Sequence, residues 1–88
     1  MSKSIYDERY IGLIAVLKAA RLSAGITQQQ VASRLAKPQS YVAKVEGRER
    51  RLDVIEFLDF AKSINWDPIP TLMNSYLQAP DSRSSSEN

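Results

Sequence analysis

The amino-acid sequence predicts an all-α fold, and three observations support that prediction. Apolar side chains recur at three- and four-residue steps along most of the chain, which is the spacing of one helix face. Helix-start signals, such as Thr or Asp three residues ahead of Gln or Glu, occur at several points. No stretch alternates apolar and polar residues as a half-buried strand does. We therefore expect five helices and no sheet, without repeats of solenoid length.

The first helix is expected to begin near Ser4 or Asp7 and to end at Gly25, because glycine favours the left-handed exit from a helix. Its inward stripe is expected to comprise Tyr10, Leu13, Ile14, Leu17, Arg21 and Ala24. The second helix begins at Thr27, which can cap the amide of Gln30 while the Gln30 side chain reaches back. It should run to about Leu35. The residues that should face inward are Val31, Ala32 and Leu35, with Ile26 packed on Val31.

The segment 36–38 interrupts the second helix, and Pro38 is expected to be the first residue of the third, since proline is tolerated there. Val42 and Val45 should face inward on this third helix. Residues 47–51 are polar and aperiodic, which predicts a loop.

The fourth helix repeats the start signal of the second: Asp53 caps, Glu56 completes the box, and Leu52 packs on Phe57. Its inward stripe is expected to be Val54, Phe57, Leu58, Ala61 and Ile64. Residues 67–70 begin a fifth helix with both prolines in its first turn. Its apolar face comprises Ile69, Leu72, Met73, Tyr76 and Leu77. Residues 1–78 therefore form one domain, and residues 79–88 should be a disordered tail.

Composition excludes several kinds of site. The 88 residues include no cysteine and no histidine, which removes disulfides, thiolate metal sites and the commonest general base. We therefore expect no enzyme, no metal and no cofactor. No apolar run approaches the ~18 residues of a membrane span, and the N-terminus lacks a signal-peptide core, so a cytoplasmic location is expected.

Charge is distributed unevenly along the chain. Residues 18–51 contain eight cationic and two acidic side chains, a net charge of +6, whereas residues 52–88 contain two cationic and six acidic ones, a net charge of −4. A basic middle and an acidic end suggest a surface polarised toward a polyanion.

Two short helices joined by a three- or four-residue turn can place the second helix in the DNA major groove, which is ~12 Å wide. A set of residues stands at a distinctive spacing along these helices: Arg21, Gly25, Thr27-Gln28, Ala32, Val45-Glu46 and Phe57-Leu58 with Ala61. With these residues the sequence resembles the XRE family, the repressor-and-Cro class of helix-turn-helix regulators of phages and bacteria, over residues 10–66. The resemblance implies a five-helix lambda-repressor-like DNA-binding domain in which helices 2 and 3 form the motif, and residues 37–57 are similar to those of compact, free-standing members.

The resemblance also implies roles for individual residues. Base contacts are carried over onto Gln39, Ser40 and Lys44, and onto Tyr41 as well. Gln28 would contact DNA phosphate. The cations that flank the third helix would act as phosphate clamps: Lys37, Arg48, Arg50 and Arg51. Arg21 and Glu46 would form a structural pair between helices 1 and 3.

The sequence departs from the family pattern at two positions. Ala36 stands where the family usually has Gly, at a cost of about 1–2 kcal/mol if the backbone is left-handed. Gly47 stands one place earlier than the glycine of the family's Glu-x-Gly, which predicts an earlier end of the third helix.

The sequence thus predicts a dimeric, sequence-specific regulator of bacterial or phage origin, acting as a repressor on double-stranded DNA with paired half-sites. The expected dimer interface comprises Trp66, Ile69, Leu72, Met73, Tyr76 and Leu77. An alternative is a protein-binding module: either the antitoxin of a toxin–antitoxin pair, or an anchor whose last helix and tail bind an unknown partner.

Overall fold

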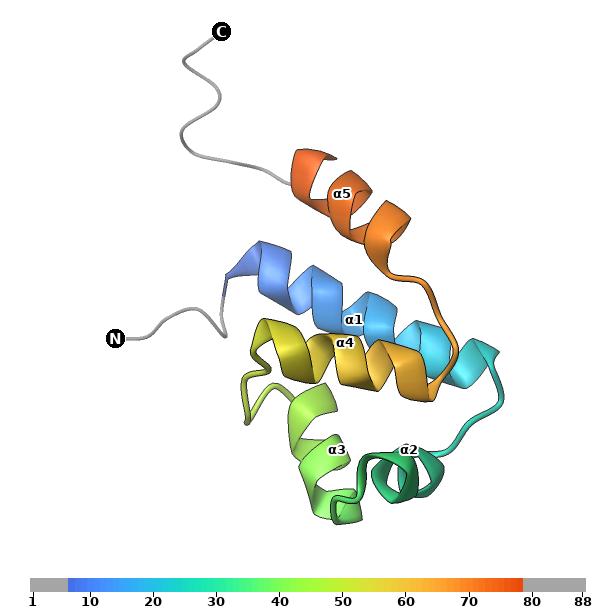
Figure 1. Cartoon of the computed structure of the whole chain (residues 1–88). Coiled ribbons are helices and arrows are strands. Elements are labelled where there is room, and N and C mark those ends of the chain that lie inside the picture. Colours follow the sequence, from blue (N-terminus) through green and yellow to red (C-terminus); the bar gives the residue numbers. More distant parts are fainter. Residues whose placement is uncertain (1–6, 79–88) are drawn as a thin grey trace, which may run out of the picture.

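The computed structural model describes residues 7–78 and contains five helices over that range, which confirms the all-α prediction. The helices are α1 (Glu8–Ser23), α2 (Gln28–Leu35), α3 (Gln39–Glu46), α4 (Val54–Ser63) and α5 (Ile69–Gln78). Figure 1 shows α2 and α3 together at one end of the molecule, with α1 and α4 above them and α5 at the opposite end. The expected disordered tail lies outside the described residues.

The helix ends follow the predicted capping signals. Asp7, not Ser4, caps α1 by accepting the backbone N–H of Arg9, and Gly25 is left-handed with φ of 73°. Thr27 and Gln30 form a complete capping box at the start of α2. Asp53 and Glu56 form a second box at the start of α4. Each box satisfies two N–H groups that the first turn of a helix leaves unpaired.

Two predictions at helix ends were wrong by a residue or so. Pro38 has extended backbone (φ −72°, ψ 156°) and precedes α3 as its N-cap, so Gln39 is the first helical residue. Ala24 follows the last residue of α1 and is exposed, because α1 ends before the expected stripe reaches it. The loop 47–51 lies where it was expected, between α3 and α4.

The core joins one face from each of the first four helices. Ile14 and Leu17 of α1 and Val42 and Val45 of α3 are almost completely buried. The other buried members of the core are Val31, Ala32, Leu52, Phe57, Phe60 and Ile64. Because α3 has its two valines fixed in this core, the opposite face of α3 is directed away from the protein.

The buried stripe of α4 differs from the predicted one. Phe60 is fully buried, whereas Leu58 is 40% and Val54 71% exposed. Each residue turns the helix by about 100°, so a stripe that includes Phe60 leaves Leu58 at its edge. Side chains in a helix tilt toward its N-terminus, so Val54 in the first turn points beyond the core. The sequence prediction was wrong for both Val54 and Leu58.

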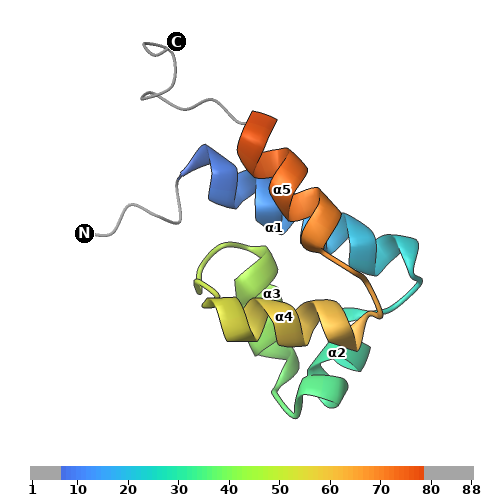
Figure 2. The same ribbon diagram turned by 45° about the horizontal axis from the view of Figure 1, so that its top comes forward.

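Asp67 precedes α5, and its carboxylate accepts the N–H of Ile69, the first residue of the helix. Helix α5 lies along α1. In Figure 2, α4 and α5 lie on the same side of the molecule, with α1 behind α5. Trp66 lies in the connection between α4 and α5, and its ring meets that of Phe57 edge-on, with the centroids 6.4 Å apart. Among the described residues, no single helix has the length and apolarity to cross a membrane; only α1 and α2 together pass that test, bent by 101°.

Candidate nucleic-acid interface

A tight turn sets α2 against α3. Ala36 ends α2 in the left-handed conformation, with φ of 57° and ψ of 43°, and the N–H of Lys37 returns to the Ala32 carbonyl at 2.9 Å. The chain then extends through Pro38 into α3. The two helices make the most extensive helix–helix contact in the fold. This is the helix-turn-helix arrangement, with Ala36 at the position where the sequence lacks the usual glycine.

A buried ion pair fixes the end of α3 to α1. The Arg21 guanidinium donates from Nε to Glu46 Oε2 at 2.6 Å and from Nη2 to Oε1 at 2.9 Å. Its Nη1 donates to the Ile26 carbonyl at 2.8 Å. The Arg21 and Glu46 side chains are only 7% and 3% exposed. The two charges therefore neutralise each other inside the protein, as expected of a structural ion pair.

Gln28 continues this network toward the surface. Its amide Nε2 donates to Glu46 Oε1 at 3.0 Å, and its Oε1 accepts the Gln39 Nε2 at 3.3 Å. Gln28 was predicted to contact phosphate; in the structure it is half-buried and links the ion pair to the first residue of α3. One connected set of hydrogen bonds thus runs from Arg21 to Gln39, which orients the Gln39 side chain.

The outward face of α3 carries small and polar side chains. Ser40, Ala43 and Lys44 are exposed at positions three and four residues apart, opposite the buried valines. Gln39 is exposed at the edge nearest α2. Three of the four predicted base-contacting residues, namely Gln39, Ser40 and Lys44, therefore share this solvent-facing side of one short helix.

Tyr41, the fourth, lies apart from them on the flank of α3 that faces α4. Its ring packs on the core and has Lys37 Nζ at 5.2 Å and the Arg50 guanidinium at 4.8 Å from its centroid. Burial raises the pKa of the Tyr41 phenol, and the negative charge of Glu56 adds to that increase. The Tyr41 ring thus makes cation–π contacts with Lys37 and Arg50 and lies apart from the outward face of α3.

The loop between α3 and α4 is held by its own arginines. Arg50 binds the Glu56 carboxylate through Nη1 at 3.1 Å and Nη2 at 2.9 Å. Arg51 lies over the Tyr10 ring at 5.1 Å, and the Tyr10 hydroxyl accepts the N–H of Leu52 at 3.1 Å. The bonds from Arg50 lower the pKa of Glu56, so that carboxylate is ionised at neutral pH.

The displaced glycine does not occupy the left-handed position of this loop. Gly47 has φ of −85°, and a Cβ there would lie 3.2 Å from the Ala43 carbonyl oxygen. Arg48, the next residue, is left-handed instead, with φ of 60°. Helix α3 ends at Glu46, and the strained conformation falls on a cationic residue predicted to contact DNA.

Comparison with known proteins agrees with this geometry. Residues 17–65 match the family model described as Helix-turn-helix. The fold is similar to that of an XRE-family like protein from Pseudomonas syringae pv. tomato str. DC3000, with a TM-score of 0.80 and 49% sequence identity. That similarity covers 89% of this chain and 95% of the other. No match to a curated protein was found.

The chain belongs to the XRE family of helix-turn-helix proteins. The resemblance predicted from Arg21, the Thr27-Gln28 pair and Val45-Glu46 is confirmed, and with it the small five-helix DNA-binding fold. The chain is thus a DNA-binding regulator of the XRE type.

The sequence predictions missed the contacts of two residues that support the candidate interface. Glu56 was assigned only to the cap of α4, and it also binds Arg50 six residues earlier. Tyr10 was assigned only to the α1 stripe, and it also contacts Arg51 and accepts the N–H of Leu52, which is 42 residues away in sequence. The Arg50–Glu56 contact joins residues only six positions apart, so the sequence could have suggested it. No local sequence signal points to the contacts of Tyr10.

Proposed function

We propose that this XRE protein is a sequence-specific, dimeric transcriptional repressor that reads DNA by inserting α3 into the major groove. The observation that supports this most directly is the outward face of α3. There Gln39, Ser40 and Lys44 are exposed together, while the buried Arg21–Glu46 pair and Gln28 hold the helix and Gln39 in place. A major-groove reader needs such pre-oriented amide, hydroxyl and ammonium groups.

The three α3 side chains differ in what they can recognise. The Gln39 amide can pair bidentately with adenine, the Lys44 ammonium can donate to guanine O6 and N7, and the Ser40 hydroxyl suits either. In this proposal Lys37, Arg48 and Arg51 border α3 and hold the phosphate backbone. Such contacts set register on the duplex without reading sequence.

Dimerisation is proposed through the face formed by α4 and α5. Ile69, Met73 and Leu77 are exposed at four-residue steps along one side of α5. Within the interface predicted from sequence, Leu72 and Trp66 instead pack partly on the protein's own core, and the Tyr76 side chain lies outside the described residues. On α4, Val54, Ile55 and Leu58 are also exposed, and Leu58 lies beside the residues that lead into α5.

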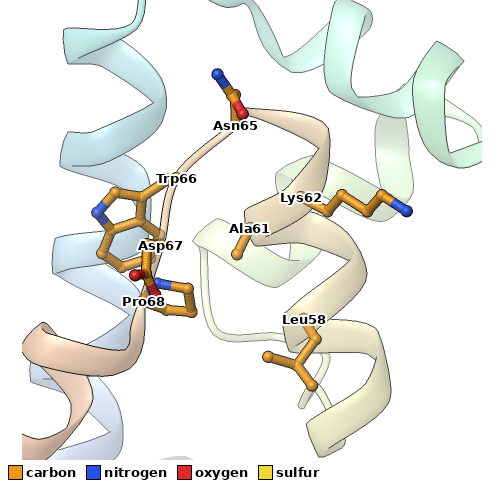
Figure 3. A pocket seen from close by; sticks show the side chains of 7 residues that line it. All are labelled: Leu58, Ala61, Lys62, Asn65, Trp66, Asp67 and Pro68. Carbon is orange, nitrogen blue, oxygen red and sulfur yellow. The ribbon is translucent and has the colours of Figure 1, made fainter.

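A hollow between α4 and the start of α5 adds shape to this surface. It has a volume of about 360 Å³ and lies between Leu58 and Ala61 of α4 and Trp66 and Pro68 of the connection, as Figure 3 shows. Lys62 and Asp67 border it with opposite charges. Across a two-fold axis, these opposite charges allow Lys62 of one copy to pair with Asp67 of the other.

Selection of bound sequences from a random pool of double-stranded DNA tests the proposed function. A dimer that reads two grooves should enrich sites with two inverted half-sites whose centres lie about one helical turn, ~10 base pairs, apart. Reporter transcription from a promoter overlapping the selected site should then fall when the protein is expressed. A pool that gains no common sequence would refute sequence-specific reading, and a reporter whose transcription rises would refute repression.

A further inference from the structure

One cation beside α3, Arg50, already has an anionic partner inside the protein. Arg50 binds Glu56 bidentately, at 3.1 and 2.9 Å, and its Nη1 also donates to the Arg51 carbonyl at 2.9 Å. The flat face of the guanidinium lies over the Tyr41 ring. Two terminal nitrogens are therefore occupied, and the charge of Arg50 is matched by a carboxylate at the distance a phosphate oxygen would take.

The position of this pair places it within reach of DNA. Tyr41 belongs to α3, and Lys37, which lies in the turn before α3, is over the same ring. The side chains of Arg50 and Glu56 are 40% and 26% exposed, so both are open to solvent. A duplex whose groove holds α3 would have its backbone beside Lys37 and Arg50. Glu56 is the carboxylate that binds Arg50 there, and the charge of Asp53 also acts on Arg50.

We propose that Glu56 competes with DNA phosphate for Arg50 and thereby lowers the affinity of this protein for double-stranded DNA of any sequence. The inference rests on the proposed insertion of α3 into the major groove. Phosphate contacts contribute affinity without sequence information, and each one releases condensed counterions from DNA. An arginine bound to a carboxylate of its own chain adds to DNA affinity only if it first breaks that ion pair. Glu56 is thus an affinity-setting residue as well as a helix cap.

Glu56→Gln tests the proposal without removing the cap, because glutamine serves in capping boxes and Gln30 already does so in α2. The variant should bind a selected operator and a mixed-sequence duplex more tightly by a similar factor, roughly two- to fivefold, the range of an exposed ion pair. The slope of log K against log salt should steepen by ~0.9, the effect of one added phosphate contact.

Two further variants isolate the contact. Asp59→Asn removes one exposed negative charge from the same helix and controls for net charge, so its slope should stay that of the unmodified protein. Arg50→Ala combined with Glu56→Gln should lose the gain completely. Thermal unfolding of each variant establishes that it is folded.

A Glu56→Gln protein that binds more weakly, or with an unchanged salt slope, would overturn the proposal, because Glu56 would then orient Arg50 or Arg50 would not reach phosphate. Failure of the unmodified protein to bind any duplex would instead reject the proposed function itself. A gain that persists in the double variant would also overturn the proposal, since the added contact would not come from Arg50.

Discussion

Among single residues, those with left-handed backbone conformation mark where the chain is strained. Ala36, Arg48 and Asn65 all have positive φ, and none is glycine. Two of them, Ala36 and Arg48, stand at either end of α3. A left-handed non-glycine residue costs about 1–2 kcal/mol. The helix that carries the candidate base contacts is therefore bounded by strained residues, a pattern common at functional sites.

Ala36→Gly should raise the free energy of unfolding by roughly 1 kcal/mol, because relief of the left-handed strain exceeds the added unfolded-state entropy of glycine. The control is Ala19→Gly at an exposed, right-handed position inside α1, which should lower stability by about 1 kcal/mol. Urea unfolding measures both. Equal losses in the two variants would show that Ala36 is not strained in solution.

At the scale of the elements, capping chemistry predicted the fold well. Thr27 and Asp53 mark two helix starts because a side-chain cap acts over only three residues. The buried stripe of α4 was less predictable, because Phe60 and Leu58 are both apolar and only the packing partners decide which one turns inward. The outward face of α3 followed from sequence, since its buried valines determine what remains outside. The Tyr41 and Arg50 contacts depend on the path of the loop, which local sequence does not specify.

The docking of α3 onto α1 depends on the Arg21–Glu46 pair. Glu46→Gln should reduce the free energy of unfolding by about 3–5 kcal/mol, because it leaves the Arg21 charge buried without a counter-charge. Combining it with Arg21→Gln should recover part of that loss. The exposed Glu49→Gln is the control and should change stability by no more than about 0.5 kcal/mol. If Glu46→Gln were as mild as Glu49→Gln in urea unfolding, the pair would not fix α3.

In the whole molecule, α2 and α3 lie at one end and α5 lies at the other (Figure 1). The exposed apolar side chains of α5 are Ile69, Met73 and Leu77. In the proposed dimer, contact through α5 would leave α3 free for DNA. The acidic half of the sequence supplies α4, which carries Glu56 and Asp59, and α5, which carries no charged residue.

Met73→Asp should convert a dimer to a monomer in sedimentation experiments, because it places a charge at an apolar position that is 54% exposed on α5. Gln29→Asp adds a charge to an exposed position of α2, distant from α5, and should leave the dimer intact. Sedimentation of the unmodified protein as a monomer, both free and on DNA, would reject the dimer. A dimer that survives Met73→Asp would place the interface elsewhere.

If α3 reads bases while the surrounding cations hold phosphates, Gln39→Ala should affect sequence preference and not general DNA affinity. Binding is measured by titration of the selected operator and of a scrambled duplex at several salt concentrations. We expect Gln39→Ala to weaken operator binding by ~1–3 kcal/mol, to leave scrambled binding nearly unchanged and to keep the salt slope. Arg51→Ala, the comparison variant, should weaken both duplexes about equally and flatten the slope by ~0.9. Equal losses on both duplexes for Gln39→Ala would contradict the placement of α3 in the major groove.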